Sequence, residues 1–228
     1  MSESLFTQNI NPDLLPLAER SRPKSLDQII GQKHFLSEKS AVFKLLKNNH
    51  LLNLIFWGPP GTGKTSLAMS LAHSASAHWI QMNAIDAGVK DLKLACETGR
   101  NLKLEQGRKT LLFVDEIHIL MGAGQSGGAL DAANLIKPAL ARGELWLIGA
   151  TTYAEYRAHI EKDPAFTRRF VKINISEPSH EQTLEILQGI RHKYEDHHKT
   201  SIADEQLKTL VSLSGRYIGD NQFPAKAI

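Results

Sequence analysis

A loop of eight residues in the first third of the chain has the residue types needed to hold a triphosphate. The loop and the residue after it are Gly58, Pro59, Pro60, Gly61, Thr62, Gly63, Lys64, Thr65 and Ser66. Glycine tolerates positive φ, so Gly58, Gly61 and Gly63 would let successive backbone N–H groups approach phosphate oxygens. Lys64 supplies a charge for the β- and γ-phosphates, and the Thr65 hydroxyl is a ligand for Mg²⁺, which prefers oxygen. The pattern predicts a site for a nucleoside triphosphate with Mg²⁺.

Two adjacent carboxylates follow an apolar run later in the chain. Asp115 and Glu116 come directly after the run 111–114. Because the carboxyl ends of parallel strands form the edge where α/β sheets bind ligands, we expect both acids at that edge. Asp115 is predicted to hold Mg²⁺ through water. Glu116 is predicted to orient and polarise the water that attacks the γ-phosphate.

A parallel sheet is needed to bring these residues together. Short apolar runs bounded by polar, glycine or proline residues predict strands at 53–57, 78–83, 111–114, 145–152 and 171–175. Helical spacing between them indicates an α/β fold, with a wound parallel sheet and helices on both faces. After Pro178 the pattern is helical only, and Ser179 with Gln182 forms a capping box. We therefore divide the chain into an N-terminal extension (1–15), a nucleotide-binding core (16–177) and a partial helical lid (178–228).

The composition is that of an ordinary soluble protein. Of the 228 residues, 42% are hydrophobic and 22% are charged, and the net charge of +3 is too small to require a nucleic-acid partner. The single cysteine, Cys96, excludes an internal disulfide and fits a reducing compartment. No apolar run approaches membrane-spanning length, so we expect a cytoplasmic protein with no membrane partner.

The order of the loop, the two acids and the lid, with the run 147–152 between acids and lid, resembles an AAA+ ATPase along nearly the whole chain. The resemblance implies a five-stranded parallel sheet flanked by helices. It also implies ATP and Mg²⁺ as cofactors, ATP hydrolysis as the activity, and self-association into a ring or another oligomer.

Residues from about 16 to 117 resemble the RarA/MgsA group of replication-associated recombination ATPases. The resemblance rests on the segments 16–23, 26–32 and 88–91. It implies a strap beside the adenine, to which Arg22, Pro23, Ile30 and Gly31 would contribute. It also implies DNA as the partner.

Residues from about 115 to 228 resemble instead the first ATPase ring of the Clp/Hsp100 unfoldases. The resemblance rests on the segments 122–124, 131–145, 161–170, 194–198 and 216–220. It implies a polypeptide substrate, and a sensor role for Thr152, which would contact the γ-phosphate or the attacking water. Arg168 and Arg169 would reach the γ-phosphate of a neighbouring subunit. A solvated basic pair at a helix end is the alternative for these two arginines.

The two resemblances meet at 113–118, so the chain reads as a mosaic. We expect an ATPase that acts in DNA replication or recombination, because the phosphate loop lies in the RarA-like half. In addition, the segment 86–91 lacks the aromatic residue with which Clp unfoldases grip polypeptide. Clp-type protein remodelling is the alternative. A nucleotide-binding interaction module without turnover is the third possibility.

Overall fold

The computed structural model describes residues 16–122 and 128–228. The expected N-terminal extension, and Ala123 and Gly124 of one Clp-like segment, lie outside these residues. The five strands are β1 (Leu54–Trp57), β2 (His78–Asn83), β3 (Thr110–Asp115), β4 (Trp146–Thr151) and β5 (Val171–Asn174). The helices of the core are α1 (Leu17–Arg20), α2 (Ala41–Lys47), α3 (Lys64–Ser74), α4 (Val89–Gln106), α5 (Ile117–Gly122), α6 (Gly128–Ala141), α7 (Tyr153–Glu155) and α8 (Pro164–Thr167). The lid contains α9 (His180–His198), α10 (Asp204–Tyr217) and the 3-10 turn Ala225–Ala227.

All five strands are parallel and lie in the order β2-β3-β4-β1-β5. The apolar runs predicted these strands to within about one residue at each end, and the α/β fold with a helical lid is confirmed. In the register, Trp57 of β1 is level with Thr151 of β4 and with Asn174 of β5. The loops that leave the carboxyl ends of β1, β3 and β4 therefore lie at one edge of the sheet.

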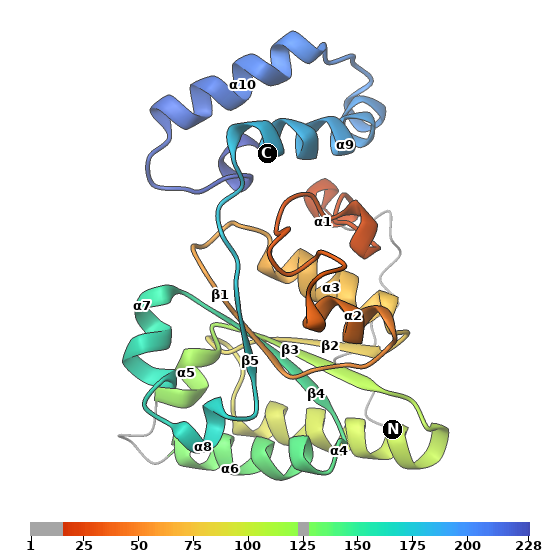
Figure 1. Ribbon diagram of the computed structural model, residues 1–228, viewed down its shortest axis with the longest axis vertical. Coiled ribbons are helices and arrows are strands. Elements are labelled where there is room, and N and C mark those ends of the chain that lie inside the picture. The colour runs from red at the N-terminus through yellow and green to blue at the C-terminus, as the bar shows by residue number, and fades with distance from the viewer. Residues whose placement is uncertain (1–15, 123–127) are drawn as a thin grey trace.

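Helices cover both faces of the sheet (Figure 1). Side chains of a strand alternate between faces, and β3 follows this rule: Leu112 and Val114 pack in one core cluster, Leu111 and Phe113 in the other. Helices α4, α5 and α6 cover the first face, and α2 and α3 cover the second. Because both faces are buried, the strands are almost continuously apolar, as parallel strands are expected to be.

The lid is a helical hairpin joined to the core by the segment after β5 (Figure 1). Its own small core contains Leu187, Leu207, Val211 and Phe223. The predicted capping box at the start of α9 is confirmed, since the Ser179 N–H donates to Gln182 Oε1 (3.0 Å) and the Gln182 N–H to Ser179 Oγ (3.2 Å). Within 16–122 and 128–228, none of the helices has the length and hydropathy to cross a bilayer. The division of the chain at residues 177 and 178 stays a prediction.

Candidate nucleotide-binding and hydrolysis site

The phosphate loop joins the end of β1 to the start of α3, as the sequence pattern requires. Gly61 (φ +74°) and Gly63 (φ +90°) adopt the left-handed conformation that favours glycine. Gly58 does not, and the expectation of a positive φ there was wrong. A Cβ on Gly58 would lie 2.0 Å from the carbonyl oxygen of Ile175, so glycine is needed for the close approach of the loop to the end of β5.

Lys64 lies across the loop that precedes it. Its Nζ donates to the carbonyl oxygens of Gly58 (3.0 Å) and Pro59 (2.8 Å). Burial lowers the pKa of Lys64, and the carboxylates of Asp115 and Glu116 oppose this shift. The lysine charge is therefore held beside the loop amides, where several donors can act on one polyanion.

The two acids lie at the carboxyl end of β3, the predicted edge. Asp115 is the last residue of the strand, and the backbone N–H of Glu116 donates to Asp115 Oδ1 (3.2 Å). Glu116 has φ +53°, a strained conformation for a residue with a side chain, and the fully buried Ile117 follows it directly. Burial raises the pKa of Glu116, and the negative charges of Glu155 and Asp115 add to the effect.

Thr152 follows β4 and caps the helix α7. Its backbone N–H donates to Glu155 Oε2 (3.2 Å), and its hydroxyl donates to the same oxygen (2.5 Å). Glu155 also lies near His118, whose Nδ1 is 3.5 Å from Glu155 Oε2 and 3.3 Å from Glu116 Oε2. Partial burial favours a higher pKa for Glu155, but the hydrogen bonds from Thr152, together with the nearby His118 and His159, outweigh it and lower that pKa.

Sequence reasoning missed Glu155 and His118 as parts of the site. Each had a usable signal. Thr152 and Glu155 are spaced as a capping box, which draws the glutamate back to the end of β4. His118 lies in the first turn after the two acids, and one ligand atom each of Glu116, His118 and Glu155 lie within 4.8 Å of one another.

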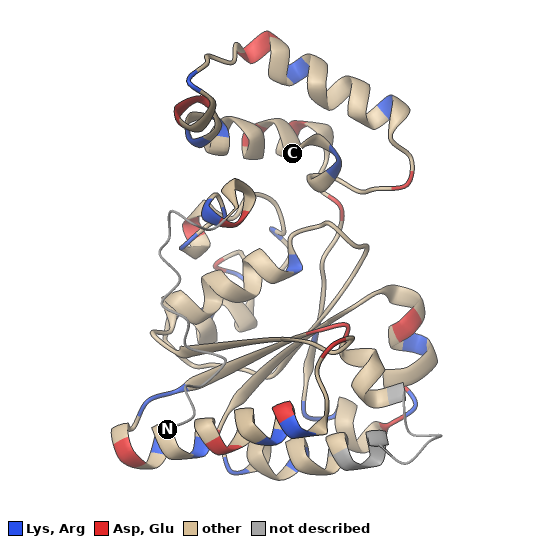
Figure 2. Cartoon of the chain, turned by 180° about the vertical axis from the view of Figure 1, so that it is seen from behind, with Lys and Arg blue, Asp and Glu red and all other residues tan. Residues whose placement is uncertain are grey.

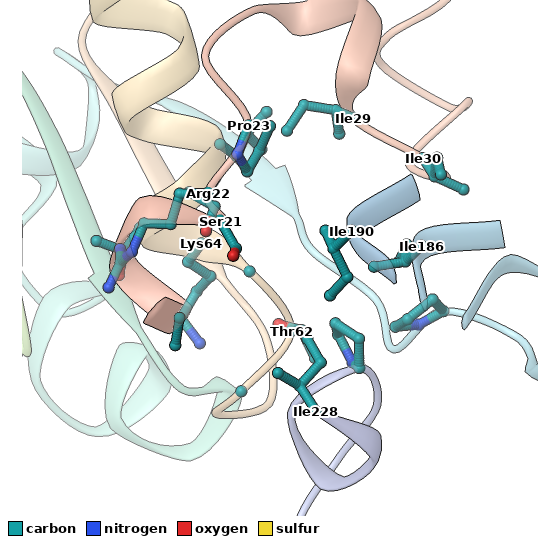
Figure 3. A pocket seen from close by; sticks show the side chains of 18 of the residues that line it. Ser21, Arg22, Pro23, Ile29, Ile30, Thr62, Lys64, Ile186, Ile190 and Ile228 are labelled. Carbon is teal, nitrogen blue, oxygen red and sulfur yellow. The ribbon is translucent and has the colours of Figure 1, made fainter. Parts of the chain in front are cut away.

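A cavity of about 690 Å³ opens beside the phosphate loop. One wall is formed by residues 60–66, with Asp115, Glu116 and Thr152 close to it. The lid supplies an apolar wall that includes Ile186, Ile190 and Ile228 (Figure 3). Of the loop residues expected to bind nucleotide, Gly58 and Pro59 do not line the cavity. They accept hydrogen bonds from Lys64 instead.

The N-terminal segment forms the third wall. Arg22, Pro23 and Ile30 line the cavity (Figure 3), whereas Gly31 does not and faces Gln182 of α9 instead. The Ser70 hydroxyl of α3 donates to the Pro23 carbonyl oxygen (3.0 Å), which anchors this segment on the core. An apolar pocket next to a phosphate loop suits a purine base.

Thr65 and Asp115 both line this cavity and offer a hydroxyl and a carboxylate. Oxygen donors of this kind fit Mg²⁺, which keeps several waters and takes few protein ligands. The two residues therefore suit the ion that accompanies a nucleoside triphosphate.

Arg168 and Arg169 lie away from the cavity. They follow α8, and they are not among the residues that line the pocket. Arg169 donates to the carbonyl oxygen of Ala165. Neither arginine lies at the phosphate loop of its own chain.

The fold and the site define a class of protein. The family described as "ATPase family associated with various cellular activities (AAA)" matches residues 54–177, and the family described as "AAA lid domain" matches residues 179–228. The chain belongs to the AAA ATPase family.

Within this family the chain is similar to Clp/Hsp100 proteins. The chaperone protein ClpB of Agrobacterium fabrum is 40% identical over 227 residues, which is 93% of this chain and 26% of ClpB. The ClpC/MecB protein of Bacillus subtilis, described as a negative regulator of genetic competence, is 40% identical over 230 residues, 95% of this chain and 28% of that protein. A solved structure of Hsp104 with ATPγS and FITC casein matches with a TM-score of 0.68 and 36% identity, over 93% of this chain and 38% of the Hsp104 chain.

The Clp-type resemblance is thereby confirmed, and the match includes residues on both sides of 113–118. The chain spans about a quarter of the length of these curated relatives. These relatives give no support to the expected role in DNA replication or recombination.

Proposed function

We propose that the chain binds and hydrolyses Mg-ATP as an AAA+ module that remodels polypeptide, in the manner of Clp/Hsp100 proteins. The observation that carries the proposal is the convergence of the phosphate loop, Asp115, Glu116 and Thr152 on one cavity at one edge of the sheet. These are the groups that phosphoryl transfer to water requires.

Each residue then has a role set by its position. The loop amides and Lys64 bind the phosphates, and Arg22, Pro23 and Ile30 form the pocket for the base together with the lid. Thr65 and Asp115 would hold Mg²⁺, which supplies positive charge to the β- and γ-phosphates. Glu116 accepts a proton from the attacking water, for which its raised pKa is suited.

A second subunit completes the proposed site. Arg168 and Arg169 lie away from their own cavity, so we assign them to the γ-phosphate of a neighbour in a ring or another oligomer. An arginine supplied in this way can raise the rate by about 10³ to 10⁵.

Polypeptide is preferred over DNA as the substrate for two reasons. The relatives are chaperones and protease subunits, and the matched Hsp104 structures contain casein. In Figure 2, Lys and Arg are interspersed with Asp and Glu along α4 and along the lid, whereas binding to a phosphate backbone favours basic residues clustered on one face.

The test compares two variants with the parent protein. Glu116→Gln should bind ATP normally and lose turnover by about 10² or more, because an amide is a poor proton acceptor. Lys64→Ala should weaken ATP binding itself. Turnover by Glu116→Gln at the parent rate would contradict the assigned site.

The substrate is tested with the same ATPase assay. Unfolded casein and forked DNA are added separately to the parent protein. Stimulation by casein supports the proposal. Stimulation by DNA alone would overturn the choice of polypeptide and restore the DNA-directed function.

A further inference from the structure

Glu155 makes more contacts than its place in a helix cap requires. An ordinary capping box needs the glutamate to accept one hydrogen bond, from the backbone N–H of the capping residue. Here one oxygen, Oε2, accepts that bond and also accepts the Thr152 hydroxyl at 2.5 Å. The same oxygen lies 3.5 Å from His118 Nδ1.

His118 connects Glu155 to Glu116. Its Nδ1 lies 3.3 Å from Glu116 Oε2, 3.5 Å from Glu155 Oε2 and 3.3 Å from Thr151 Oγ1. The His118 side chain is only 14% exposed, so it is held in this position. With Nδ1 protonated, the ring is a donor placed between two carboxylates, and it can fix the direction of the Glu116 carboxylate.

The bond from Thr152 to Glu155 decides which sensor role the threonine can perform. A hydroxyl has one proton, and the Thr152 proton is directed at Glu155. The Thr152 oxygen already accepts the Glu155 backbone N–H (3.4 Å), which leaves one lone pair and no proton. It can therefore accept one further hydrogen bond and cannot donate one to a phosphate. A water molecule that attacks phosphorus needs acceptors for its two protons, and Thr152 and Glu116 both line the cavity.

We propose that Glu155 is a positioning residue for ATP hydrolysis, which fixes Thr152 as an acceptor for the attacking water and, through His118, orients the Glu116 carboxylate. The proposal rests on the proposed function. In the step concerned, the water oxygen bonds to the γ-phosphorus, and the bond from that phosphorus to the β–γ bridging oxygen breaks. ADP leaves with the electron pair, and Glu116 takes the proton of the water.

The experiment measures kcat and KM for ATP in Glu155→Ala, His118→Ala and His118→Asn. The control is Glu161→Ala, which removes an exposed carboxylate from the same stretch of chain. We expect kcat to fall by about 10-fold or more in the two truncations, with KM within about threefold, because misplacing a reacting group by about 1 Å can cost about 10² in rate. Asparagine places an N–H near the position of Nδ1, so His118→Asn should recover most of kcat. The control should match the parent.

A double substitution separates positioning from a purely structural cap. If Glu155 acts through Glu116, then Glu155→Ala should lower kcat much less in the Glu116→Gln background than in the parent. An equal fractional loss of kcat in both backgrounds would overturn the route through His118 to Glu116, and a change in KM without a change in kcat would overturn the positioning role as a whole. Parent activity in Glu155→Ala would do the same.

The same series distinguishes this failure from a failure of the proposed function. Absence of turnover in the parent protein, or parent turnover in Glu116→Gln, would remove the proposed function and the positioning role together. Turnover that depends on Glu116 but not on Glu155 would remove only the positioning role.

Discussion

Adding one methyl group at Gly149 should destabilise the core and displace Glu116, the proposed catalytic carboxylate. Gly149 lies in β4, and a Cβ there would be 2.6 Å from Ile117 Cδ1, 2.9 Å from Ile117 Cγ2 and 3.1 Å from Ile55 Cδ1. Carbon atoms in contact lie about 3.5 to 4.0 Å apart, so Ile117 must move by about 1 Å. Overpacking of this size costs about 1 to 3 kcal/mol in the free energy of unfolding.

The movement of Ile117 should also displace Glu116 and so lower the rate of ATP hydrolysis. Ile117 follows Glu116 directly, and Glu116 already has a strained backbone at φ +53°. A shift of about 1 Å at a reacting group can cost about 10² in rate. Gly149→Ala should therefore lower kcat for ATP as well as the urea midpoint of unfolding, while the slope of the unfolding transition stays the same.

The assay is urea unfolding of Gly149→Ala, Ile117→Val and the double variant. Ile117→Val removes the nearest clashing atom, Cδ1, and should cost about 0.5 to 1.5 kcal/mol alone. The double variant should lose less free energy of unfolding than the sum of the losses in the two single variants, by about 0.5 kcal/mol or more. The control is Gly189→Ala in α9, where an added Cβ meets no atom within 4 Å and alanine should stabilise the helix by about 0.5 to 1 kcal/mol. Additive losses, or an unfolding midpoint for Gly149→Ala equal to that of the parent, would refute the reasoning.

Three further predictions concern assembly, folding and the lid. A mixture of Arg169→Ala and Lys64→Ala chains should recover ATPase activity that neither variant has alone, because some subunit interfaces then pair an intact arginine with an intact phosphate loop. Full activity of Arg169→Ala and of Arg168→Ala, each measured alone, would exclude the action of these arginines on a neighbouring subunit. Thermal unfolding should show one cooperative transition, and Mg-ATP at 100 times its Kd should increase the free energy of unfolding by about 2.7 kcal/mol. If no cooperative transition were seen with or without Mg-ATP, the two halves of the chain would not form one domain. Glu177 accepts the Phe223 N–H (2.8 Å), a bond that joins the segment after β5 to the end of the lid beside the cavity. Glu177→Ala should therefore cost about 1 kcal/mol of ATP binding free energy after allowing for exposure, which is about fivefold in Kd. An unchanged Kd would mean that this bond does not hold the lid over the nucleotide.

The sequence predicted the features that contiguous residues determine. The phosphate loop, the strand before it and the helix after it are adjacent in the chain, so their spacing alone defines them. The strands were found because both faces of the sheet are buried, which leaves long apolar runs such as 111–114. The capping box at Ser179 was found for the same local reason.

The parts that were missed depend on neighbours in space. His118 and Glu155 are 37 positions apart in the numbering and meet because β3 and β4 pair side by side. The role of Gly58 depends on the carbonyl of Ile175, at the end of a different strand. The sequence could not separate DNA from polypeptide as the substrate for another reason. The phosphate loop and the two acids are a pattern typical of ATPases in general, and this pattern carries no information about the process that ATP hydrolysis drives.

The three walls of the cavity come from three separate parts of the chain. The N-terminal segment contributes Arg22, the phosphate loop contributes Lys64, and the lid contributes Ile190 (Figure 3). A nucleotide seated there would act as a removable cross-link between them. Because hydrolysis shortens that cross-link at its phosphate end while the base end keeps its contacts, each turnover would change the tension between core and lid without breaking a covalent bond of the protein. The stiffness of the lid attachment would then set how far the lid moves in response.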